Sequence, residues 1–503
     1  MCWLFNIAQK KCIMHMCDLK IQSRRIIRLI WLDCDISMDE MQFLESVYEL
    51  AVSYLEDKGT LVDYQNFDSL EKITDTKLQV GPMPYEKILQ DIQHYLKYCV
   101  RTNQSGFMNP LWGGINTVAL AGEFLTSLTN TSMYTFELAP IGTVIEKSII
   151  SKMLGYVGYP DGAGTFTTGG SNGNMLGMLC ARLKNNPMGM QTGYDNRNLV
   201  ALVSEESHYS VVMAGNVIGI GKENIISIKS DQFGRMRADA LTEEIQYLKA
   251  EGKEVFCVVA TSGTTVKGSF DPLKELAEVC FRENIWLHVD AAWGGSALLS
   301  SKHTHLMDGI DLADSVCWDA HKMMGIPLIC SSFLVKDESI LARVCNHTKS
   351  AHYLFQNEGR TNDLGHYSLQ CGRRNDALKL FLAWRQKGDE GWSKLIDSYM
   401  ESADYVESKI SHHPRLELVS PREWTNICFR YTSEVIDENT LNKELRKRLM
   451  QNGSFMVSKA MIDGMYIIRL VISNPEITLS SLDHFIEEVV RLGEEIENEL
   501  PHR

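Results

Sequence analysis

The chain has 503 residues, and its 50 Lys and Arg against 64 Asp and Glu give a formal net charge of −14 at pH 7. Apolar residues make up 44% and charged residues 23%, a mix that excludes a disordered, collagen-like or coiled-coil chain. No long basic run offers clustered cations to phosphates, so nucleic acid is not an expected partner. No uninterrupted apolar run is long enough to span a bilayer, so no membrane association is expected.

The 13 cysteines are scattered without a paired framework, which is typical of a reducing compartment. With no convincing signal-peptide cleavage site, we expect a cytoplasmic protein. Cys12, His15 and Cys17 could be metal ligands, but no second Cys/His pair follows at zinc-site spacing, so no metal is expected. Residues 1–37 differ from everything after them. They are either an extension of unknown role or lie before a translation start at Met38.

The N-terminal part of the chain shows helical periodicity. Apolar positions recur at helical spacing over residues 38–58, with acidic residues between them, and residues 88–100 predict a second helix. The interval from about 105 to 135 is rich in Gly, Asn and Thr, which predicts loops and short helices near a site. We assign residues 38–125 to an N-terminal helical segment.

The centre of the chain alternates apolar runs of strand length with helical segments of ten or more residues. The expected strands are residues 198–204, 255–261, 285–289 and 329–335. The expected helices are residues 240–251 and 272–283, the second opened by Asp271 as cap and Pro272 at its first position. This alternation predicts an α/β fold whose large domain, residues 126–375, is built on a mostly parallel sheet.

The pattern of expected helices and strands changes near residue 376. The expected helices are residues 376–387, 392–411 and 482–500, and the expected strands are residues 426–431 and 466–472. We assign residues 376–503 to a smaller α+β C-terminal domain.

The first motif with chemical meaning is the glycine-rich stretch Gly169-Gly170-Ser171-Asn172-Gly173-Asn174, which precedes an apolar helical stretch over residues 175–184. A glycine-rich turn that feeds a helix N-terminus presents backbone N–H groups to an anion. Alone it is a weak signal, because it matches neither the dinucleotide nor the nucleoside-triphosphate fingerprint, and a plain tight turn is the default interpretation.

Three titratable residues follow in order along the central region. His208, just past an expected strand, could stack on an aromatic cofactor, although a lone histidine is more often structural. Asp290 ends an apolar strand, where ligands collect in open α/β sheets and where a carboxylate requires a positive partner. Lys322 stands beside apolar residues, where an amine can become nucleophilic, although a single lysine is usually a solvated charge. The combination is far more specific than any one member.

In these blocks the sequence resembles the group II pyridoxal-phosphate decarboxylases. The blocks are TTGGSNGNM, SEESHYS, ATSGTT, WLHVDAAWGG and WDAHKMM. Four further blocks are similar to the branch of glutamate, cysteine-sulfinate and acidic amino acid decarboxylases: NTSMYTFELAP (130–140), YLFQ (353–356), LQCGRR (369–374) and IIRLVISNP (467–475). The similarity runs from about residue 80 nearly to the end of the chain.

The resemblance implies a fold-type I lyase that binds pyridoxal 5′-phosphate (PLP) and works as a homodimer with sites at the subunit interface. Lys322 would bond covalently to the cofactor, Asp290 would pair with its ring nitrogen, and His208 would stack on its ring. The other cofactor-binding residues implied are Gly170, Ser171, Asn172, Thr261, Ala292 and His321, of which Ser171, Asn172 and His321 would hold the phosphate. Arg469 would grip a substrate carboxylate and, with the helix N-terminus, supply positive charge.

The sequence departs from the family pattern in two places near this site. Asp319-Ala320 stands where the family usually carries Asn-Pro, and a carboxylate repels a phosphate unless it finds a cation, so Asp319 is left out of the phosphate set. The loop after Gln356 is shorter than in the family, and Asn362 aligns with the tyrosine thought to return a proton to the α-carbon. Tyr367 is a conceivable substitute.

The third departure concerns the substrate. The segment that begins at Asn109 aligns with the family's substrate pocket, with Pro110 in place of Gln, and Trp112 stands where glutamate decarboxylases have a small residue. A bulky ring there should favour cysteine sulfinate or aspartate, giving hypotaurine or β-alanine, over glutamate. The alternatives are a glutamate decarboxylase making γ-aminobutyrate, an aldehyde-forming relative, and a PLP-fold binding protein that has lost turnover.

Overall fold

The structure is a computed structural model that describes residues 38–194, 198–345 and 362–499. The segment 1–37 with Cys12, His15 and Cys17, and the YLFQ block at residues 353–356, lie outside the described residues. The chain divides into two compact units, Met1–Val100 and Arg101–Arg503. Among the described helices, none combines the length and the apolar composition that crossing a bilayer requires.

The described part of the first unit is helical, with α2 (Met38–Glu56), α3 (Phe67–Ile73) and α4 (Tyr85–Tyr98). The rings of Phe43 on α2 and Tyr85 on α4 stack with their centroids 4.9 Å apart. These two helices confirm the two predicted from periodicity. The short helix α3 was not predicted, and its N-terminus is capped by the side chain of Asn66, which accepts from the Ser69 amide.

The second unit begins with β1 (Phe107–Met108), α5 (Thr117–Thr129) and α6 (Pro140–Val157). Asn116 caps α5 by accepting from the Ala119 amide at 2.9 Å, and α5 ends at Asn130 in the left-handed conformation. This helix packs on α13 (Asp376–Ser411) of the second unit. The segment assigned from sequence to residues 38–125 therefore extends across the division at Val100.

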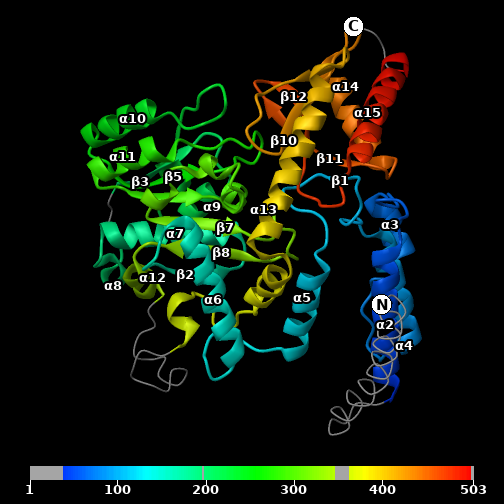
Figure 1. Cartoon of the computed structure of the whole chain (residues 1–503), viewed down its shortest axis with the longest axis horizontal. Helices are drawn as coiled ribbons and strands as arrows, with labels where there is room; N and C mark the ends of the chain where they lie inside the picture. Colours follow the sequence, from blue (N-terminus) through cyan, green and yellow to red (C-terminus); the bar gives the residue numbers. More distant parts are fainter. Residues whose placement is uncertain (1–37, 195–197, 346–361, 500–503) are drawn as a thin grey trace, which may run out of the picture. The chain divides into compact units, whose positions relative to one another are not determined.

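The large sheet has seven strands in the order β2-β8-β7-β6-β5-β3-β4. The strands are β2 (Ala163–Thr167), β3 (Leu199–Ser204), β4 (Ile225–Ile228), β5 (Glu254–Thr261), β6 (Trp286–Asp290), β7 (Ser315–Asp319) and β8 (Ser331–Val335). The neighbours from β7 through β4 run parallel, whereas β8 pairs antiparallel with both β7 and β2. The expected mostly parallel sheet and α/β class are confirmed (Figure 1).

Both faces of this sheet are buried. On β3, Val200 and Leu202 belong to one apolar cluster, and the alternate residues Ala201 and Val203 belong to another. Successive strand residues point to opposite faces, so the period of two divides one apolar run between two cores. This explains why the strands are continuous apolar runs in the sequence.

The helices and turns that cover this sheet follow the strands in the chain. The helices are α7 (Gly170–Asn185), α8 (Gly189–Thr192), α9 (Ser210–Val217), α10 (Ala238–Ala250), α11 (Leu273–Glu283) and α12 (Glu338–Val344). The 3-10 turns are η1 (Lys222–Asn224), η2 (Gly294–Leu299), η3 (Thr304–Met307), η4 (Ile310–Leu312) and η6 (Leu364–Tyr367).

Helix α7 packs closely on the sheet. A Cβ built on Gly177 would lie 2.4 Å from His288 Nδ1, and one on Gly173 would lie 2.5 Å from Cys317 Sγ. These two glycines are four residues apart and therefore share one helix face. Their missing side chains let the start of α7 approach the carboxyl ends of β6 and β7.

Asp271 does not have its predicted role as the cap of α11. Helix α11 begins at Leu273, and its cap residue Pro272 provides no side-chain hydrogen bond. The Asp271 carboxylate instead accepts from the amides of Thr261 at 2.7 Å and Met236 at 2.6 Å. These tertiary donors satisfy the carboxylate and leave it unavailable to the helix.

The C-terminal part of the second unit carries a five-stranded sheet in the order β1-β11-β12-β10-β9. Its elements are α13, β9 (Leu416–Leu418), β10 (Asn426–Tyr431), α14 (Glu438–Gln451), β11 (Met456–Ile462), β12 (Met465–Val471) and α15 (Leu479–Glu499). The break predicted between two helices is a kink in α13 at Gly388, whose φ of 62° is left-handed. Helix α14 and strand β11 were not predicted.

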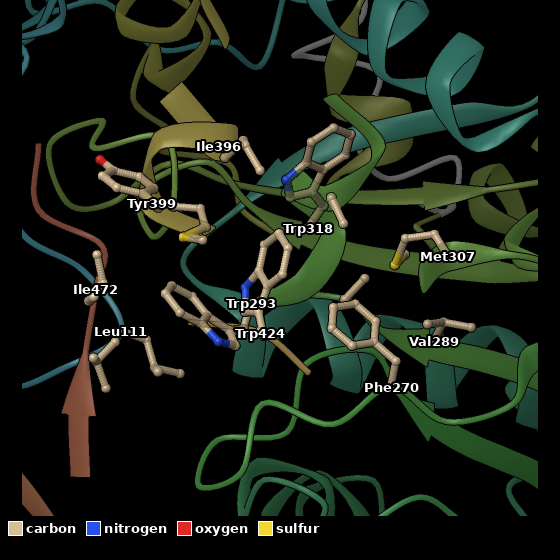
Figure 2. Packing of buried hydrophobic residues seen from close by; sticks show 14 of the residues in the cluster. Leu111, Phe270, Val289, Trp293, Met307, Trp318, Ile396, Tyr399, Trp424 and Ile472 are labelled. Carbon is tan, nitrogen blue, oxygen red and sulfur yellow. The ribbon is translucent and has the colours of Figure 1, made fainter. Parts of the chain in front are cut away.

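Trp293 joins the two sheets' cores. Figure 2 shows its ring beside Trp424, with Phe270 and Val289 toward one side and Leu111 and Ile472 toward the other. The Trp293 indole N–H donates to Asn426 Oδ1 at 2.8 Å, so the polar edge of this buried ring is satisfied. The segment that follows Asp290 is thereby fixed against β10.

Candidate active site

Three polar residues end three neighbouring strands of the large sheet. Thr261 closes β5, Asp290 closes β6 and Asp319 closes β7. Thr261 pairs in register with Asp290, and Asp290 with Cys317, two residues before Asp319. Since parallel strands end at one edge, the structure brings these side chains together at the sheet edge where α/β proteins bind ligands.

The Asp290 carboxylate is 5% exposed and receives two hydrogen bonds. The side-chain amide of Asn174 donates to its Oδ2 at 2.7 Å, and the Ala292 backbone N–H donates to its Oδ1 at 3.1 Å. Asn174 Oδ1 in turn accepts from His288 Nε2 at 3.1 Å. Burial lowers the pKa of His288 to about 4, so this imidazole is neutral and donates through Nε2.

A short chain of hydrogen bonds links Asp290 to His208. Asn174 Nδ2 also donates to Ser210 Oγ at 3.0 Å, and Ser210 Oγ lies 2.8 Å from His208 Nδ1. Burial lowers the pKa of His208, which Asp290 counteracts and Lys322 reinforces. Asn174 and Ser210 were not assigned a role from sequence, although Asn174 stands inside the glycine-rich block that drew attention there.

Lys322 lies beside the end of β7. Its Nζ is 3.4 Å from Asp319 Oδ2, and its side chain is 20% exposed. His321 Nε2 lies 3.6 Å from the same carboxylate oxygen, and burial lowers the pKa of His321 despite this neighbour. The loop that carries both residues is held from behind by the buried Lys379 ammonium, which donates to Ile329 O at 2.7 Å.

The start of α7 reaches the same edge. Gly169 precedes the helix with a φ of 120° and offers no side-chain cap. At Gly170 an added Cβ would lie 3.2 Å from Ala292 Cβ and 2.8 Å from Asp319 Oδ2, which places this turn against both strand ends. Ser171 is exposed, whereas the Asn172 side chain accepts from Gln370 at 3.5 Å. A helix start of this kind favours an anion.

The Thr261 side chain is available for a ligand. It is buried, and its Oγ1 has no hydrogen-bond partner among the described residues. Its backbone N–H donates to Asp271, the carboxylate expected as a helix cap. Burial raises the pKa of Asp271 to about 7, although the two amides lower it.

The contacts described for the predicted substrate residues are with residues other than Lys322, Asp290 and Asp319. Arg469 is buried on β12, where its guanidinium donates to Thr265 O and to Ser458 Oγ, the latter at 3.0 Å. Thr265 belongs to the same ATSGTT block, residues 260–265, as Thr261. Asn109 and Trp112 follow β1, and the rings of Trp112 and Phe107 are 5.5 Å apart.

The segment with Trp112 approaches the lysine loop through its backbone. A Cβ built on Gly325 would lie 3.7 Å from Gly113 O, so the residue after Trp112 borders the loop three residues beyond Lys322. By contrast, the Tyr367 hydroxyl donates to Glu338 Oε1 on α12 at 2.5 Å, and Asn362 accepts from Lys147 on α6 at 2.7 Å. Tyr367 and Asn362 therefore each have a hydrogen-bond partner other than Lys322.

Comparison with known proteins gives a family for most of the chain. The pyridoxal-dependent decarboxylase conserved domain matches residues 68–432. Acidic amino acid decarboxylase GADL1 of Xenopus tropicalis is 35% identical over 476 residues, which cover 90% of this chain and 93% of that protein. The crystal structure of mouse CSAD has a TM-score of 0.87 and 34% identity, and covers 90% of this chain and 98% of that one. Tryptophan decarboxylase of Catharanthus roseus, with a TM-score of 0.83, 23% identity and coverage of 92% and 99%, shares the fold.

Proposed function

Because the chain belongs to the pyridoxal-dependent decarboxylase family, we propose that it removes the α-carboxylate of a small acidic amino acid, with cysteine sulfinate or aspartate preferred. The chain is a PLP-dependent amino acid decarboxylase by this membership. The observation that supports our site assignment most is the meeting of Lys322, Asp290 and the start of α7 at one edge of the sheet.

The residues at this edge fit PLP. Thr261 Oγ1 is a buried hydroxyl without a described partner. No side chain caps the start of α7, so its backbone N–H groups can bind an anion. When bound, PLP supplies an electron-withdrawing ring that accepts the electrons of the broken bond to the carboxylate. Lys322 would hold the cofactor through its amine, and Ser171, Asn172, Gly170 and His321 would hold its phosphate.

Each remaining residue of the cluster has a proposed task. Asp290 would hold the proton on the ring nitrogen, and the donors Asn174 and Ala292 orient this carboxylate. His208 and Ala292 would pack on the two ring faces, and Thr261 would line the site. Neutral His208 suits stacking because it adds no positive charge against the ring.

Arg469 and Trp112 support the choice of a small acidic substrate. The Arg469 guanidinium donates to the carbonyl oxygen of Thr265 in the loop after β5. Its Nε is buried without a partner among the described residues. Such a group can take a substrate carboxylate. The Trp112 ring would shorten the pocket beside the lysine loop, which disfavours glutamate.

The assembly we propose is a homodimer. Large apolar side chains are exposed along α5 and α6, among them Phe124 at 65% and Ile141 at 69%. Exposed apolar side chains in such numbers on neighbouring helices indicate a surface that another protein covers. The cysteines of the described residues are free thiols, which supports our expectation of a reducing compartment such as the cytoplasm.

Carbon dioxide release tests the proposal directly. Purified protein loaded with PLP is offered cysteine sulfinate, aspartate and glutamate separately, with Lys322→Ala as the control. We expect release from the two shorter acids and none from the control. Glutamate as the best substrate would refute the substrate assignment, and absence of release with all three would refute acidic amino acid decarboxylation.

A further inference from the structure

Asp319 is a buried carboxylate that the proposed reaction does not use. It is 2% exposed, and its Oδ1 has no hydrogen-bond donor among the described residues. Its Oδ2 faces Lys322 Nζ at 3.4 Å and His321 Nε2 at 3.6 Å. An unpaired buried carboxylate oxygen costs free energy, and a ligand that binds at this edge has to bind beside it.

The carboxylate lies where an anion would bind. A Cβ on Gly170, the first residue of α7, would lie 2.8 Å from Asp319 Oδ2 and 3.3 Å from Oδ1. The same helix start and His321 are the groups that we assign to the cofactor's phosphate. Because burial lowers the pKa of His321, this imidazole is neutral near pH 7, and Lys322 is the cation that Asp319 faces.

We propose that Asp319 opposes the cofactor's phosphate and competes with it for His321, so that this chain binds PLP weakly and exchanges it readily. This inference rests on the proposed function for the identity of the cofactor. Two like charges in a buried corner repel strongly, because little water screens them. The fraction of active enzyme would then follow the concentration of free PLP.

Titrations of the cofactor-free protein separate the phosphate from the rest of the cofactor. PLP and pyridoxal, which has the same ring and aldehyde but no phosphate, are each added to wild type and to Asp319→Asn. Binding is followed by the absorbance of the bound ring. We expect the variant to bind PLP at least ~10-fold more tightly and pyridoxal within about twofold of wild type, since only the phosphate meets the carboxylate.

A matched control lies at the other end of the same strand. Asp314 immediately precedes β7 and accepts from the Leu287 amide at 2.8 Å. Asp314→Asn removes the same charge and should leave PLP affinity within about twofold of wild type, because the added distance and water weaken its effect on the phosphate. An equal gain in both variants would overturn the proposal, because it would show an effect of net charge alone.

Two other results would also overturn it. One is unchanged or weaker PLP binding by Asp319→Asn. The other is equal tightening toward PLP and pyridoxal, which would assign the effect to Lys322 alone. The wild-type protein gives an independent check, since PLP should bind no more than about tenfold more tightly than pyridoxal, and a ratio above roughly 1000 contradicts a repelled phosphate. These titrations use no substrate, so failure to release carbon dioxide remains a separate result.

Discussion

Asn174 connects the Asp290 carboxylate to the His208 imidazole. Its Nδ2 lies 2.7 Å from Asp290 Oδ2 and 3.0 Å from Ser210 Oγ, and Ser210 Oγ lies 2.8 Å from His208 Nδ1. Asn174 and Asp290 are 116 residues apart in the chain. One amide on α7 therefore orients two residues that we assign to the cofactor's ring.

Replacement of Asn174 by Leu should lower kcat/KM by roughly 10- to 100-fold. The leucine fills the space but leaves Asp290 Oδ2 without its side-chain donor, and a hydrogen bond to a buried charge contributes about 1.5–3 kcal/mol. Steady-state kinetics would measure the loss. Asn185→Leu is the matched control, because Asn185 ends the same helix and donates to Glu254 at 2.7 Å. Equal losses in both variants would argue against a role in the site.

Acid should destabilise the folded chain through His288. Its folded pKa of about 4 lies below the usual value of 6.5, so the unfolded chain binds more protons between these limits. The stability contributed by neutral His288 is full above pH 6.5 and is lost as the pH falls toward 4. The shift corresponds to roughly 3 kcal/mol.

Thermal unfolding between pH 4 and pH 7 measures this effect. His288→Gln should flatten the dependence, because it removes the titrating group from the network of Asn174. His412→Gln, at an exposed position, should keep the wild-type slope. A slope unchanged in His288→Gln would show that other groups control acid stability.

The buried ion pair of Glu146 and Arg373 should matter for stability more than the neighbouring exposed pair. Arg373 Nη1 lies 2.8 Å from Glu146 Oε2, and both side chains are buried. Arg373→Met leaves the carboxylate buried and unpaired, which should cost about 3–5 kcal/mol. Denaturant unfolding would measure this loss.

The adjacent Arg374 provides the comparison. Its side chain is 54% exposed and pairs with Glu123, so Arg374→Met should cost less than about 1 kcal/mol. The double variant Glu146→Leu with Arg373→Met should recover most of the stability, because no buried charge remains. Equal effects of the two single variants would contradict the importance of burial.

Trp112→Ser should improve glutamate turnover relative to the shorter acids. Removal of the ring opens the pocket beside Gly113 and the lysine loop, and pocket contacts of this size change selectivity by roughly 10- to 100-fold. Competing-substrate assays would give the ratio of kcat/KM values. Trp112→Phe keeps an aromatic ring and should keep the wild-type preference. If glutamate turnover does not improve in the serine variant, the steric argument is wrong.

The sequence by itself determined the α/β class and the family. Apolar runs and glycine-rich turns are local patterns, and they were sufficient to predict that Asp290 ends a strand and that a helix follows Gly169. The family and its cofactor were predicted from motifs whose chemistry demands particular residues, and the comparisons confirm both.

Only the tertiary structure decided which side chains meet. Asp271 stands where a helix cap is expected, yet amides from two other segments occupy its carboxylate. The bridge from Asn174 to Asp290 exists because Gly173 and Gly177 let α7 approach the sheet, and the contacts of Asp319 exist because β7 ends beside that helix. Such contacts depend on strand order and close packing between distant segments, and these are not encoded in any local pattern of residues.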